Sequence, residues 1–69
     1  MANFIVNFEG RYYNSLRTHK LIDYSKDEAI RRAKMIGDVH DADSFYIEYM
    51  GSGKTVGYWE KKGSRWYKE

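Results

Sequence analysis

The five residues GSGKT, at positions 51–55, are of the types that end a phosphate-binding loop. Such a loop needs the pattern G-x-x-x-x-G-K-[ST] between a strand and a helix, because free amides at the helix N-terminus hold the phosphate. The first glycine would fall at position 48, where the chain has Glu48, and the residues at 56–59 are largely β-branched or aromatic, which is typical of a strand. We therefore predict that GSGKT is a solvent-exposed hairpin loop and not a nucleotide site.

Few other residues have the types and spacing for catalytic or metal chemistry. There is no Cys, and His19 and His40 are far apart in the sequence. The acidic run at 38–43 lacks the glycine and the glutamate of a calcium loop, and it lacks the further histidines of a metal-dependent phosphohydrolase site. We predict a solvated acidic loop, no catalytic site, no metal and no cofactor, so the protein is expected not to be an enzyme.

Basic, aromatic and methionine side chains are the remaining candidates, and their chemistry is that of binding. Tyr, Met and Arg are enriched at protein interfaces, whereas aromatic residues on a sheet with nearby lysines bind single-stranded nucleic acid. Which chemistry applies depends on the elements that position these side chains.

The length and composition of the chain limit those elements. Sixty-nine residues bury only ~60% of the surface that the unfolded chain exposes, so we expect one small domain over residues 1–69. Without disulfides, its core must come from seven Tyr, two Trp and three Phe. No basic segment precedes an apolar run and no stretch could span a bilayer, so we expect a cytoplasmic protein without membrane association.

Alternating apolar residues predict the strands. Phe4, Val6 and Phe8 share one face of a first strand, which a turn at residues 9–11 ends. A second strand is predicted from Tyr12 to about Leu16, continuing irregularly to Ile22. Further strands are predicted at residues 44–50, 56–60 and 65–68.

A capping box formed by Ser25 and Glu28 predicts a helix from about Lys26 to Ile36, with Gly37 as a left-handed C-terminal cap. Its stripe of Ala29, Ile30, Ala33 and Ile36 would lie on the sheet, and Asp27–Arg31 and Glu28–Arg32 are spaced for ion pairs.

The predicted order is ββαβββ, an α+β fold with a single antiparallel sheet and one helix packed on one face. In the hairpin around GSGKT, we place Met50 opposite Val56 and therefore Ile47 opposite Trp59. Around the turn at 61–64, Trp59 would face Trp66 across the strands, with Tyr58 and Tyr67 paired on the other face. We predict that the two tryptophans belong to the core.

This arrangement leaves two candidate binding faces. One is the outer helix face, which is either a salt-bridged solvent face or a contact surface. The other is the uncovered sheet face, whose tyrosines are either merely half-buried or available for binding. The residues expected on the sheet face are Tyr46, Glu48, Met50, Val56, Tyr58, Glu60, Arg65 and Tyr67.

Charge is distributed unevenly along the chain. Residues 38–50 hold four acidic residues and no Lys or Arg, whereas residues 1–37 hold seven basic and four acidic residues and residues 51–69 hold five basic and two acidic residues. Two basic segments thus flank an acidic one, which suits a negatively charged or mixed partner or an ordinary solvated surface.

From about Leu21 to Lys68 the chain resembles small phage-encoded anti-CRISPR proteins, type I-F inhibitors in particular. The shared features are a Ser-started helix with an Arg/Lys run at 25–34, the strand residues Ile47-Glu48, and the closing hairpin at 58–66. The first hairpin, Phe4 to Leu16, has no match, and the acidic loop departs from the pattern.

The resemblance implies a binding protein without catalysis. Such inhibitors dock on a CRISPR surveillance complex, along the basic groove where guide RNA meets target DNA, and some also engage duplex DNA. The basic helix face that takes part would correspond here to Arg31, Arg32 and Lys34.

We therefore expect a phage or mobile-element protein that binds a host CRISPR effector complex or another defence protein in the cytoplasm of the infected cell. Non-specific DNA binding is expected to be weak. The candidate partner-binding residues are Arg31, Arg32, Lys34, Met35, Tyr58, Arg65 and Tyr67. The alternative is a nucleic-acid-binding domain that uses the aromatic sheet with Lys54, Lys61, Lys62 and Lys68.

Overall fold

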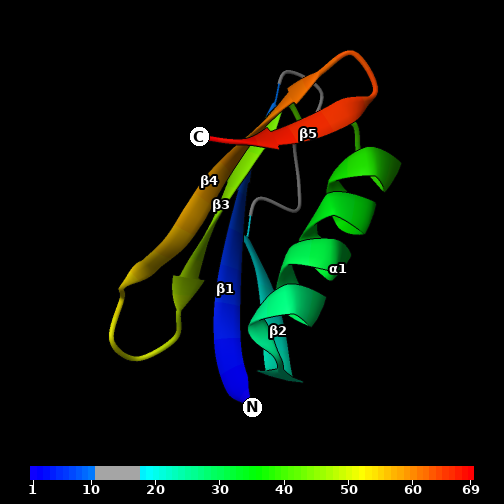
Figure 1. Ribbon diagram of the computed structural model, residues 1–69. Coiled ribbons are helices and arrows are strands. Elements are labelled where there is room, and N and C mark those ends of the chain that lie inside the picture. The colour runs from blue at the N-terminus through cyan, green and yellow to red at the C-terminus, as the bar shows by residue number, and fades with distance from the viewer. Residues whose placement is uncertain (11–17) are drawn as a thin grey trace.

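Strands and one helix follow one another in the order ββαβββ in the computed structural model, which describes residues 1–10 and 18–69. The elements are β1 (Ala2–Glu9), β2 (Thr18–Tyr24), α1 (Lys26–Val39), β3 (Ser44–Tyr49), β4 (Thr55–Lys62) and β5 (Arg65–Lys68). The strands form one antiparallel sheet in the order β2-β1-β3-β4-β5, and α1 lies along one face of it (Figure 1). The predicted fold class and element order are confirmed.

The core lies between α1 and the central strands. Phe4, Val6 and Phe8 of β1 are buried as their alternation predicts, and so are Phe45 and Ile47 of the neighbouring β3. The helix contributes mainly its small residues Ala29 and Ala33, while the larger Ile30 and Ile36 pack at the edges of the core. The small side chains let the helix approach the sheet closely, which leaves its opposite face outward.

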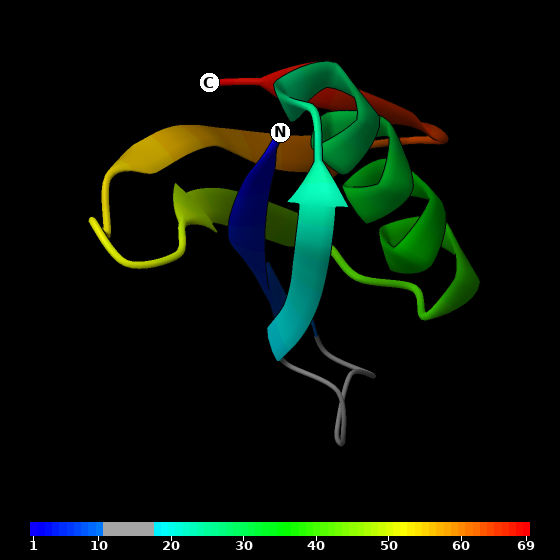
Figure 2. The same ribbon diagram turned by 90° about the horizontal axis from the view of Figure 1, so that it is seen from below.

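The sheet is strongly twisted, so that β5 crosses toward the C-terminal end of α1 (Figures 1 and 2). Trp66 of β5 contacts both Gly37 of α1 and Phe45 of β3, where the centroids of the two rings are 5.0 Å apart. The helix is therefore held at both ends, by β1 and β2 near its start and by β5 near its end.

The helix runs further than predicted. It ends at Val39 with His40 as its cap, and the left-handed conformation that follows is taken by Asp41, with φ of 56°. Gly37 is a buried residue inside the helix. A side chain would not fit there, because a Cβ would lie 2.8 Å from Cζ2 of Trp66. The glycine thus serves close packing and not capping, and Asp38 belongs to the helix instead of to an acidic loop.

The predicted capping box is present, but it prevents one of the predicted ion pairs. Ser25 Oγ accepts from the Glu28 amide at 3.2 Å, and Glu28 Oε1 accepts from the Ser25 amide at 3.4 Å and from Ser25 Oγ at 2.9 Å. With its carboxylate turned toward Ser25, Glu28 forms no ion pair with Arg32. No ion pair joins Asp27 to Arg31 either in the part of the chain that the structure describes.

Both predicted hairpin registers are wrong by two residues, a shift that keeps the paired side chains on their predicted faces, with Val56 as the exception. Trp59 lies opposite Phe45, and Gly57 lies opposite Ile47. Within β4, the Trp59 ring folds over Gly57, where a Cβ would lie 2.8 Å from Cη2 of the indole. A bulge between Ile47 and Glu48 also places the half-buried Val56 against the core.

In the second hairpin, Trp59 faces Lys68 and Trp66 faces Lys61, so the two tryptophans are diagonal neighbours on the helix side. Trp59 is buried and Trp66 is half-buried against the core. Tyr67 faces Glu60 and not Tyr58.

The second strand ends later than predicted, at Tyr24 instead of near Ile22. It spans Thr18 to Tyr24, with a register shift near its end and a positive φ of 63° at Asp23. The predicted strand residues 12–16 and part of the predicted turn at 9–11 lie outside the described residues. Within the described ranges, no helix is long and apolar enough to cross a membrane.

Candidate partner-binding surfaces

A shallow hollow of about 190 Å³ opens on the outer side of α1. Its lining consists of Tyr24, which ends β2, and Glu28, Arg31, Arg32 and Met35 of the helix. Each arginine is three or four residues from both Glu28 and Met35, which is why these side chains meet on the outer face. The hollow therefore combines two cations, one carboxylate and an apolar thioether.

The two arginines of the hollow have few interactions of their own. Arg32 Nε donates to Tyr24 Oη at 3.3 Å, and its Nη1 lies 4.0 Å from Met35 Sδ. Arg31 is exposed, and neither arginine forms an ion pair among the residues that the structure describes. Met35 is 50% exposed, which leaves an apolar surface beside two arginines that form no ion pair among the described residues.

The predicted sheet face carries its aromatic residues in one row. Tyr46 of β3 and Tyr58 of β4 are directly opposite each other and stack with ring centroids 6.1 Å apart and planes at 5°. Tyr67 of β5 is on the same face, opposite Glu60, which is two residues after Tyr58 on β4, and it is 48% exposed. This row lies on the side of the sheet opposite to α1.

Carboxylates surround this row. Tyr58 Oη donates to Glu9 Oε1 at 2.8 Å and lies 3.3 Å from Ser44 Oγ, and Asn7 Nδ2 donates to Glu48 Oε1 at 3.0 Å. The hydrogen bond with Ser44 acts to lower the pKa of Tyr58, but the hydrogen bond to Glu9, partial burial and the negative charges of Glu9 and Glu69 together raise that pKa above its usual value. The hydroxyl of Tyr58 therefore lies next to a carboxylate.

The seven predicted partner-binding residues are divided between the two faces. Arg31, Arg32 and Met35 line the hollow, and Lys34 is half-buried on α1 outside the lining. Tyr58, Arg65 and Tyr67 belong to the opposite sheet face, where Arg65 pairs with Lys62 beside the β4–β5 turn.

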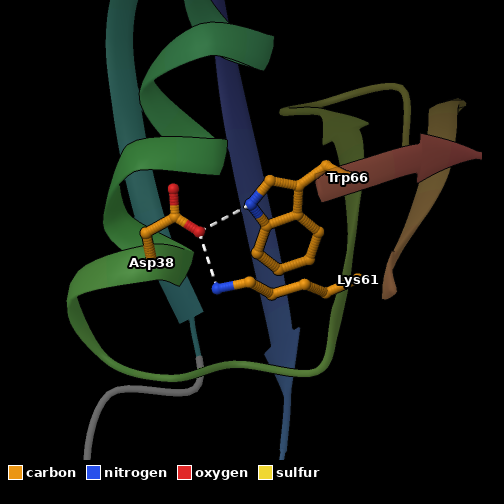
Figure 3. Close-up of polar contacts among 3 residues, drawn as sticks. All are labelled: Asp38, Lys61 and Trp66. Atoms are coloured by element: carbon orange, nitrogen blue, oxygen red, sulfur yellow. Dashed lines mark hydrogen bonds and ion pairs between the residues drawn. The ribbon is translucent and has the colours of Figure 1, made fainter. Parts of the chain in front are cut away.

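The four lysines of the alternative prediction do not form one patch with the tyrosines. Lys61 Nζ pairs with Asp38 Oδ1 of α1 at 2.9 Å, where Trp66 Nε1 also donates at 2.9 Å (Figure 3). Lys68 Nζ lies over the Trp59 ring at 5.7 Å from its centroid, again on the helix side. Lys54 is in the hairpin loop, and only Lys62 shares the face of the tyrosines, 3.9 Å from Glu60.

The structure confirms that GSGKT belongs to an exposed hairpin loop. Gly51 and Gly53 adopt positive φ of 97° and 74°, and β4 begins at Thr55 without a helix. Tyr49 N donates to Lys54 O at 2.8 Å and closes the loop. No group of three His, Asp or Glu side chains within the described ranges is placed to hold a metal ion.

Sequence reasoning missed three residues of these surfaces. Tyr24 is not among the predicted residues, yet it ends β2 four positions before Glu28 and lines the hollow with the helix. Glu9 and Ser44 meet Tyr58 only through the pairing of β1 with β3, which joins segments far apart in the sequence. Alternation along the strands is the one sequence signal that assigns them to this face: Glu9 follows the core residue Phe8, and Ser44 is two residues before Tyr46.

In comparisons with known proteins, no family model, no curated protein and no solved structure matched the chain. The resemblance to type I-F anti-CRISPR inhibitors thus stands on the sequence features alone, and any function must be argued from the two surfaces.

Proposed function

We propose that this protein is a non-enzymatic inhibitor from a phage or mobile element that binds a host CRISPR surveillance complex, or another defence complex, in the cytoplasm and blocks access of target nucleic acid. The observation that carries the proposal is the outer helix hollow, where Arg31 and Arg32 lack ion pairs among the described residues and lie beside exposed Met35. The resemblance to anti-CRISPR inhibitors names the kind of complex.

The chemistry of the hollow favours a protein partner. Small-molecule sites usually enclose ~300–1,000 Å³, and this hollow of about 190 Å³ is smaller and shallow. It suits one side chain of a partner, with the arginines binding carboxylates or backbone carbonyls around it. Arg is among the residues that contribute most to binding energy when they are desolvated at an interface.

The alternative of a nucleic-acid-binding sheet has less support. Its tyrosines lie among Glu9, Glu48 and Glu60, whereas Lys61 and Lys68 are on the other side of the sheet. Carboxylates beside the stacking surface repel phosphates.

The test is whether the protein prevents a purified type I-F surveillance complex from binding labelled target DNA. We expect inhibition by the wild-type protein and a loss of at least tenfold in potency for Arg31→Glu/Arg32→Glu, because both cations reverse. The matched control is Lys26→Glu/Lys54→Glu, which makes the same change in net charge on exposed residues outside the hollow. This control should inhibit like the wild type.

Two results would contradict the proposal. If the wild-type protein leaves DNA binding by the complex unchanged, and pull-downs from CRISPR-bearing hosts recover no defence complex, the function is wrong. If the arginine reversal inhibits as well as wild type, the outer helix face is not the binding surface. Sub-micromolar binding of free oligonucleotides that weakens steeply with salt would favour the nucleic-acid alternative.

A further inference from the structure

The sheet face opposite α1 differs in character from the helix face. Its centre is the stacked pair Tyr46 and Tyr58, and carboxylates lie on both sides of that pair. Glu48 follows Tyr46 by two residues on β3, Glu60 follows Tyr58 by two residues on β4, and Glu9 accepts the Tyr58 hydroxyl. Residues two apart on a strand share a face, so the rings and the acids form one surface.

These carboxylates keep acceptor capacity. Among the described residues, Glu9 and Glu48 accept hydrogen bonds at Oε1, from Tyr58 and Ser44 in one case and from Asn7 in the other. A carboxylate has two oxygens with about four lone-pair positions, so these donors do not use all the positions of either group. Glu60 is paired at 3.9 Å with Lys62, but both side chains are largely exposed and such pairs are weak.

Among the residues that the structure describes, the basic side chains on this face lie at its margins. Lys20 is opposite Ile5 on the outer strand β2, and Lys62 and Arg65 pair beside the β4–β5 turn. Among the described residues, the charged groups nearest the aromatic centre are carboxylates, since Glu9 accepts from Tyr58, and the negative charges of Glu9 and Glu69 act to raise the pKa of that tyrosine. A partner that covers this centre must bring positive charge.

Guanidinium fits such a surface better than ammonium does. It is planar, stacks on tyrosine rings and donates two parallel hydrogen bonds to a carboxylate, whereas the lysine ammonium is a compact and strongly hydrated charge. Here the ring faces and the carboxylate oxygens lie next to each other, so one guanidinium can use both.

We propose that the sheet face formed by Tyr46, Tyr58, Glu9, Glu48 and Glu60 binds an arginine-bearing segment of a partner protein. This surface is separate from the outer helix face, and the inference does not depend on the function proposed above. It gives the protein two binding faces of opposite charge on opposite sides of one small fold.

The experiment uses the full chain and a fluorescent peptide in which arginine alternates with glycine, with matched peptides carrying lysine or glutamate instead. At an ionic strength of about 0.15 M, we expect the arginine peptide to bind more tightly than the lysine peptide and the glutamate peptide not to bind. Backbone amide shifts in NMR spectra should change on β1, β3 and β4 and not on the helix.

The decisive variants replace carboxylates by amides of the same shape. Glu9→Gln and Glu48→Gln should each weaken the arginine peptide about tenfold, because a hydrogen bond to a charged group is lost or weakened. The double substitution Asp27→Asn/Asp41→Asn removes two acidic groups elsewhere and should have no effect. Glu60→Gln is a third test at an exposed position, for use if either of the first two variants lacks a cooperative melt.

The helix reversal Arg31→Glu/Arg32→Glu separates this inference from the proposed function, because it should leave peptide binding unchanged while it abolishes inhibition. The inference is overturned if the carboxylate variants bind the arginine peptide like wild type, if lysine and arginine peptides bind equally, or if the amide shifts map to α1. It is also overturned if an oligonucleotide binds this face more tightly than the peptide.

Discussion

Asp38 joins three elements through a single oxygen. Its Oδ1 accepts from Lys61 Nζ of β4 and from Trp66 Nε1 of β5, both at 2.9 Å (Figure 3). These contacts lower the pKa of Asp38 below its usual value: the hydrogen bond with Lys61 has the largest effect, burial opposes it, and the Trp66 hydrogen bond and the Lys61 charge add to the lowering. The residue therefore fastens the end of the helix to the last hairpin.

We expect Asp38→Asn to weaken the fold in a pH-dependent way. A carboxyl whose pKa is lower in the folded state stabilises the fold above its unfolded pKa, which is near 3.8, and this contribution is lost as the pH falls through the folded value. The side chain is half exposed, so the loss near pH 6 should be only ~0.5 kcal/mol in the free energy of unfolding.

The measurement is urea denaturation followed by tryptophan fluorescence at about pH 6 and at about pH 2.5. The difference between Asp38→Asn and wild type should be present at the higher pH and vanish at the lower one. Lys61→Met should remove the same pH-dependent difference. A gap that persists unchanged in acid would show that shape, and not charge, is what the substitution alters.

At the level of elements, the sequence determined which elements form and which faces they bury, but not where they stop or how they pair. The capping box placed the start of α1 correctly because it depends on residues three apart. Gly37 does not end the helix but lies inside it against Trp66, a contact with β5 that the local sequence does not reveal. The hairpin registers likewise depend on which residues of two strands pair, and alternation is unchanged by a shift of two residues.

Gly37→Ala tests whether this glycine is there for packing. Alanine favours a helix interior by ~1 kcal/mol over glycine, so an isolated helix would gain stability. Here the new Cβ would lie 2.8 Å from Cζ2 and 3.1 Å from Cη2 of Trp66, and we expect a net loss of ~1–3 kcal/mol from overpacking. Thermal melts with the emission maximum of tryptophan as a second signal would detect both the loss and the displaced ring.

The matched comparison is the same change in a Trp66→Leu background, which removes the ring that the Cβ meets. There, Gly37→Ala should become neutral or stabilising, since only the helix preference remains. If the alanine is equally harmful in both backgrounds, the indole is not the reason for the glycine.

At the scale of the whole molecule, one helix covers one face of the sheet and leaves the other open. The sequence predicted an uncovered sheet face, because it contains the pattern of one amphipathic helix and one helix can cover only one face of the sheet. It also predicted that the candidate residues divide between the outer helix face and the sheet face, but not that Glu9 and Ser44 contact Tyr58, since these partners come from β1 and β3. The charge of a face depends on strand order, and strand order involves pairing between distant segments.

Trp59 is the side chain whose removal should cost the most. It is 3% exposed, stacks on Phe45 with ring centroids 5.2 Å apart and planes at 15°, and lies over Gly57. Replacing a buried tryptophan with alanine costs ~3–5 kcal/mol, and the whole stability of a small domain is ~5 kcal/mol or little more. We therefore expect Trp59→Ala to lose its cooperative thermal transition. Tyr67→Ala, which truncates an exposed aromatic of the same sheet, should melt within a few degrees of wild type. If Trp59→Ala also melts cooperatively and close to wild type, the core between α1 and the sheet does not depend on this indole, and the buried position assigned to it is wrong.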